Sequence, residues 1–160
     1  MVTYLNDTGQ EGYDSPILIK LPAEVEDQMQ QLFDADLIES HTLSSAKPDF
    51  NSTYIMITPE NTFVVMKIIP DEQDSRVKGR FITAGFEVLP LNKKGFSSSI
   101  KHGDSGSPVF KVIDDKNGNY DLKRTFAGPI SAILRDGYKL SEDLNGNATQ
   151  GIVSILSLSK

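Results

Sequence analysis

The sequence predicts a mainly β protein, an antiparallel barrel or sandwich of about six strands with one amphipathic helix before it. The main observation is a series of short runs rich in β-branched and aromatic side chains after residue 49, separated by turn-forming residues. The helix is indicated by apolar side chains at helical spacing over residues 22–39. A length of 160 residues fits one domain with a short appendage.

The predicted strands follow one another without an internal repeat. Turn chemistry separates them, and Asn117-Gly118 is the strongest single hairpin signal. The strands are expected at residues 53–58, 63–69, 80–88, 107–113, 125–134 and 151–158.

The N-terminal part of the chain is a distinct acidic segment. Residues 1–50 hold ten acidic residues against two lysines, a net charge of −8, whereas residues 51–160 carry +2. We therefore expect an acidic N-terminal segment, 1–48, and a β domain, 49–160.

The predicted helix over 22–39 begins with Pro22, a residue suited to the first turn of a helix. Its apolar residues fall on one side, and we expect this stripe to pack against the core. The stripe consists of Val25, Met29, Leu32, Phe33 and Leu37.

Composition excludes several classes of function. The chain has no cysteine, which excludes disulfide frameworks, thiolate nucleophiles and iron–sulfur clusters. It has two histidines, His41 and His102, too few for a metal site built on several histidines, and no cofactor is expected. The net charge of −6 disfavours nonspecific binding to nucleic acid.

No apolar run approaches the length of a membrane span, and the first ten residues lack the pattern of a secretory signal. We therefore expect no membrane partner, and a cytoplasmic location by default.

One motif of the sequence suggests a catalytic site. Residues 103–108 read Gly-Asp-Ser-Gly-Ser-Pro and lead directly into a predicted strand. Glycines on both sides of a serine let the chain turn tightly enough to aim the N–H groups of Gly103 and Ser105 at one point. Acyl transfer needs such converging donors, because negative charge builds up on the carbonyl oxygen.

The run resembles the nucleophile loop of chymotrypsin-like (trypsin-like, PA clan) serine proteases, whose signature is Gly-Asp-Ser-Gly-x-Pro. The resemblance implies that Ser105 is the nucleophile and that the N–H groups of Gly103 and Ser105 form the oxyanion hole. It also implies that Asp104 fixes the loop and is not the acid of the catalytic triad.

The fold implied by the resemblance is a chymotrypsin-like antiparallel β-barrel. The resemblance covers roughly residues 78–158, where the strands follow the serine loop in the order that the family shows. The second barrel of the two-barrel fold is therefore the better supported one. The first barrel is expected to be reduced or missing, because residues 1–50 do not show a set of strands.

The family's triad also needs a base and an acid before the serine. His41 is the candidate base, because His102 adjoins Gly103 and cannot turn back onto Ser105 as a well-oriented base. Asp49 is the candidate acid, eight residues after His41. Asp71 and Asp74 remain alternatives for this role.

The resulting expectation is a serine peptidase that hydrolyses peptide bonds in a protein or peptide substrate through an acyl-enzyme on Ser105. The substrate-binding pocket is expected to involve His102, Ala127 and Gly128. The alternative is a catalytically inactive protease-like domain that binds peptides or a protein partner.

Overall fold

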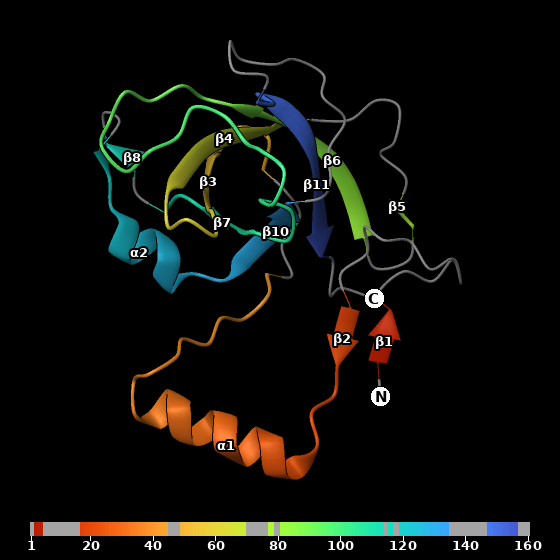
Figure 1. Cartoon of the computed structure of the whole chain (residues 1–160). Coiled ribbons are helices and arrows are strands. Elements are labelled where there is room, and N and C mark those ends of the chain that lie inside the picture. Colours follow the sequence, from red (N-terminus) through yellow and green to blue (C-terminus); the bar gives the residue numbers. More distant parts are fainter. Residues whose placement is uncertain are drawn as a thin grey trace.

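A computed structural model of the chain describes residues 2–4, 17–44, 49–69, 77–78, 81–113, 115–116, 119–134 and 147–156. The fold is mainly β, as the sequence predicts, with a curled antiparallel sheet and two helices among the described residues (Figure 1).

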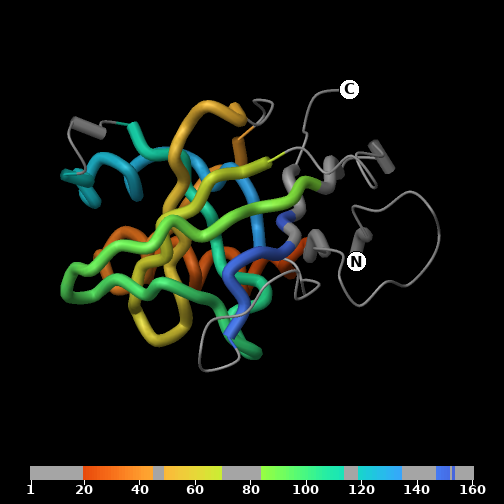
Figure 2. The backbone as a smooth tube through the Cα atoms, turned by 90° about the horizontal axis from the view of Figure 1, so that it is seen from above, coloured from red at the N-terminus to blue at the C-terminus, as the bar shows by residue number. Residues whose placement is uncertain are grey.

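The main sheet has seven antiparallel strands within the described ranges. They are β3 (Thr53–Ile57), β4 (Phe63–Ile69), β5 (Val77–Lys78), β6 (Phe81–Val88), β7 (Pro108–Lys111), β10 (Ile130–Leu134) and β11 (Gln150–Leu156). Their order in space is β11-β10-β7-β3-β4-β6-β5, and β11 also pairs with β6. The pairings of six strands therefore form a ring, and Figure 2 shows β4 and β6 side by side within it.

The curled sheet buries side chains on both of its faces. On β3, Tyr54 and Met56 belong to the cluster inside the curl, whereas Ile55, between them, belongs to a cluster on the outer face. This alternation follows from the two-residue period of a strand. The partly buried residues that pack on the outer cluster are Phe63, Leu89, Leu91, Phe96, Tyr120, Leu122 and Phe126.

Helix α1 (Ala23–Asp34) is shorter than the predicted helix over 22–39. It ends because Asp36 adopts a left-handed backbone with φ of 55°. The N–H of Leu37 then donates to Leu32 and that of Asp36 to Phe33, which closes the last turn. The expected core packing is wrong for this helix, since none of its residues is buried.

Helix α2 (Leu122–Ala127) takes the place of the first three residues of the strand predicted over 125–134. Asp121 caps this helix, because its carboxylate accepts a hydrogen bond from the N–H of Arg124 at 3.3 Å. Gly128 ends it, and β10 begins only after Pro129. Local capping chemistry therefore overrides the β propensity of this run.

Two short antiparallel pairs complete the described structure. β1 (Val2–Tyr4) pairs with β2 (Ile17–Ile19) before α1, and β8 (Asp115–Lys116) pairs with β9 (Asn119–Tyr120). The predicted Asn117-Gly118 turn falls between β8 and β9 but lies outside the described residues. Neither described helix is long and apolar enough to cross a membrane.

Candidate functional site

The serine loop, residues 103–107, contains two glycines with a left-handed backbone conformation. Gly103 and Gly106 have φ of 99° and 86°, values that side chains with a Cβ rarely adopt. A Cβ at either glycine would meet no atom within 4 Å, so the loop needs these glycines for their conformation and not for space.

Asp104 anchors the loop from inside. It is only 3% exposed, and its carboxylate accepts a hydrogen bond from the N–H of Lys101 at 3.0 Å. The N–H of Ser107 donates to the carbonyl of Asp104 at 3.1 Å. The role that the resemblance gives Asp104, fixing the loop, agrees with these contacts.

Two further hydrogen bonds fasten the serine loop to the end of β10. The N–H of Gly106 donates to the carbonyl of Leu134 at 2.8 Å, and the N–H of Leu134 donates to the carbonyl of Ser107 at 2.9 Å. Ser105 lies exposed at the tip. No described residue accepts a hydrogen bond from the N–H of Gly103. The exposed residue Ser105 is thus two positions from a backbone donor of the kind an oxyanion hole needs.

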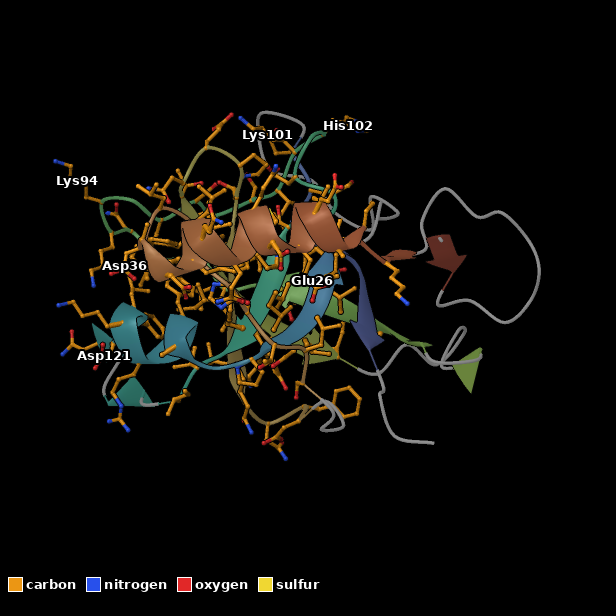
Figure 3. The ribbon with its side chains drawn as sticks, turned by 90° about the horizontal axis from the view of Figure 1, so that it is seen from below. Glu26, Asp36, Lys94, Lys101, His102 and Asp121 are labelled. Atoms are coloured by element: carbon orange, nitrogen blue, oxygen red, sulfur yellow. The ribbon has the colours of Figure 1, made fainter. Side chains whose placement is uncertain are left out.

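Basic side chains border the serine loop. Lys101 and His102 are both exposed and lie together at one edge of the molecule (Figure 3). The ammonium of Lys101 forms an ion pair with Glu60, and this hydrogen bond raises the pKa of Lys101. His102 directly precedes Gly103, so it lies beside the serine loop.

His41 lies on the outer face of the sheet. Its ring packs edge-on against Phe110 with the centroids 5.2 Å apart, and its Nε2 is 3.5 Å from the carboxylate of Glu39. The next residues pair with β10, because the N–H of Ile130 donates to the carbonyl of Thr42 at 2.8 Å. His41 is thus held at the Ile130 end of β10.

Asp49 lies just before β3, in a turn closed by a hydrogen bond from the N–H of Ser52 to the carbonyl of Asp49. Its carboxylate accepts hydrogen bonds from the Ser52 hydroxyl at 2.7 Å and from the N–H of Asn51 at 3.0 Å, and Lys111 Nζ is 3.5 Å away. The Ser52 hydroxyl is the main group that lowers the pKa of Asp49, followed by the N–H of Asn51.

We expect Ser52→Ala to raise the pKa of Asp49 toward its ordinary value, because the strongest hydrogen bond to the carboxylate is lost. A carboxyl pH titration by NMR measures this pKa. Since folding lowers it, the stabilisation from the carboxylate is present at neutral pH and is lost as the pH falls through the folded pKa. Lys111→Ala is the control and should raise the pKa less; an unchanged pKa in Ser52→Ala contradicts the assignment.

The structure does not bring the three predicted triad residues into contact. The serine loop bonds to Leu134, at one end of β10, whereas His41 and Asp49 contact Phe110 and Lys111 beside the other end. Along β10, Ile130 and Leu134 lie about 13 Å apart at the rise of an extended strand. The alternative acids, Asp71 and Asp74, lie outside the described residues.

A pocket of about 800 Å³ adjoins His41. The residues that line it come from the end of α1 and the chain after it, from the β3–β4 turn and from α2, and include Ala127 but not Ser105. Gly128 lies next to Ile113, whose Cδ1 would be 3.2 Å from an added Cβ. Ala127 and Gly128 thus belong to the end of α2, where the sequence predicts a strand.

Within the described ranges, no three His, Asp or Glu side chains come together in a way that could hold a metal ion. Comparisons with protein-family models, with curated proteins and with solved structures found no match to this chain.

The sequence did not predict that His41 contacts Phe110, or that two further aromatic rings continue from Phe110. The ring of Phe110 also contacts Phe126 at 5.1 Å, and Phe126 contacts Phe63 at 5.4 Å. The available signal was the alternation of the strand after the serine loop, which directs Val109 and Phe110 to opposite faces.

Proposed function

We propose that this chain is a peptidase-like domain of the chymotrypsin type, in which Ser105 attacks the carbonyl of a peptide bond. The observation that supports it is the serine loop, with left-handed Gly103 and Gly106 around an exposed Ser105 and with Asp104 buried beneath. The ring of six antiparallel strands is compatible with one barrel of that fold.

In the proposed reaction, the Ser105 oxygen bonds to the carbonyl carbon while its proton passes to the imidazole of His41. The imidazolium returns the proton to the leaving amine as the peptide bond breaks, and water then releases the acid from the ester. The N–H of Gly103 would stabilise the negative charge on the carbonyl oxygen. For this reaction, the chain around His41 has to leave Ile130 and approach the serine loop.

The resting position of His41 favours a second candidate function, a peptidase-like domain that binds peptides without hydrolysing them. His41 is engaged with Glu39 and Phe110, and the residues after it pair with Ile130. In this position His41 does not contact the serine loop, and a serine hydroxyl that no base activates is a weak nucleophile.

Labelling with a fluorophosphonate probe tests the two candidates, because the probe reacts with an activated serine and needs no knowledge of the substrate. The peptidase candidate predicts labelling that is lost in Ser105→Ala and in His41→Ala. It also predicts full labelling of Ser98→Ala, the matched control for an exposed loop serine.

The absence of labelling in folded wild-type protein would overturn the peptidase candidate and leave the second one. Labelling of Ser105 that survives in His41→Ala would show that the serine loop is activated and that His41 is not its base.

A further inference from the structure

The pocket beside His41 is a groove between two helices, which we call the helix groove. One wall is the end of α1 with the chain that follows it, and the other is α2 with the β3–β4 turn. In Figure 3, Asp36 after α1 and Asp121 before α2 lie on the same side of the molecule. None of the serine loop residues lines this groove.

Apolar side chains line the helix groove and continue along α1. Phe33, Ile38, Phe63 and Phe126 are among its lining residues. Leu32, in the last turn of α1, is 38% exposed, and no residue of α1 is buried. These four lining residues are partly buried, and Leu32 precedes one of them, Phe33; exposed apolar side chains next to a groove are typical of interaction sites.

The charge around the groove points to a basic occupant. Residues 17–44 hold six carboxylates against one lysine, Lys20. Two carboxylates, Asp36 and Glu39, line the groove itself. Two basic residues, Lys123 and His41, also line it, and His41 already pairs with Glu39. A second copy of α1 would bring carboxylates against carboxylates, so pairing between two α1 helices is disfavoured.

We propose that the helix groove binds a basic amphipathic segment of a partner protein. The apolar side chains of that segment would enter the groove between Phe33 and Phe126, and its lysines or arginines would lie beside the carboxylates of α1 and of the chain after it. This is the helix-in-groove mode of recognition. The groove shares His41 with the proposed function but does not involve Ser105, and peptide binding is measured without hydrolysis, so failure of one proposal can be distinguished from failure of the other.

The test uses a fluorescent model peptide of about 18 residues, long enough to form a helix, made of Leu and Lys at amphipathic spacing. The same peptide with Glu in place of Lys is the comparison. Anisotropy titrations at physiological salt are expected to show binding of the Leu/Lys peptide and none of the Leu/Glu peptide.

Variants locate the binding. Phe33→Ser removes an apolar wall without changing the charge and should weaken binding about tenfold. Asp36→Asn with Glu39→Gln should weaken it several-fold. Glu87→Gln removes a carboxylate from the exposed surface of β6 and should leave binding unchanged. Circular dichroism checks that each variant is folded, which is expected for Phe33→Ser because α1 buries no residue.

Equal binding by Phe33→Ser and the wild type would overturn the proposal, since it would show general attraction to an acidic protein. Binding of both peptides alike, or of neither, would also overturn it. If sedimentation shows a dimer that Phe33→Ser disrupts, the groove holds a second copy and the proposed partner is wrong.

Discussion

Phe110→Ala is expected to lower the free energy of unfolding by about 3–5 kcal/mol. Phe110 is fully buried, and its ring contacts His41 on one side and Phe126 on the other. Truncation therefore leaves a cavity between β7, α2 and the segment that holds His41. Urea denaturation monitored by circular dichroism measures the change.

Phe50→Ala is the matched control, because Phe50 is 41% exposed whereas Phe110 is fully buried. Its expected cost is below about 1 kcal/mol. A loss in Phe110→Ala no larger than in Phe50→Ala would contradict the central packing position that the structure gives to Phe110.

Asp104→Ala is expected to have the second largest effect. The change leaves the N–H of Lys101 without its acceptor in a partly buried position, which should cost about 1–3 kcal/mol. If Ser105 is the proposed nucleophile, fluorophosphonate labelling should also slow about tenfold or more, because the loop no longer fixes the N–H of Gly103.

Asp104→Asn is the matched control, since its side-chain oxygen can still accept from Lys101 and should retain most of the stability. The two measurements are independent. Normal stability in Asp104→Ala would contradict the anchoring role of the carboxylate, whereas reduced stability with unchanged labelling would contradict only the catalytic role of the loop.

Most of the sheet could be predicted from the sequence because its strands carry local signals. Runs of β-branched residues between turn formers predicted β3, β4, β6, β7 and β11 to within a few residues. The helices were harder. Asp121 and Gly128 bound α2 through capping, which the β propensity of the intervening run conceals. The end of α1 depends on one left-handed residue, Asp36, which no apolar pattern reveals.

The part of the candidate site that depends on neighbouring residues in the sequence could be predicted. The conformation of the serine loop depends on glycines that stand in the motif itself, so sequence was sufficient for Gly103 and Gly106. The positions of His41 and Asp49 depend on contacts across the chain, with Phe110 and Lys111. A motif contains no information on such contacts, and the spacing of 64 residues between His41 and Ser105 does not determine where the imidazole lies.

The pairing between β6 and β11 has a consequence for the order of folding. It joins Glu87 with Gln150 at one end and Phe81 with Leu156 at the other, residues that are far apart in the chain. Contacts of such long sequence separation form slowly, because the intervening chain must be ordered before they contribute. During synthesis, one edge of β6 therefore remains unpaired until β11 has been made. An unpaired strand edge can form hydrogen bonds with strands of other chains. The pairing of β11 with β6 covers this edge and so protects the folded chain from aggregation through it.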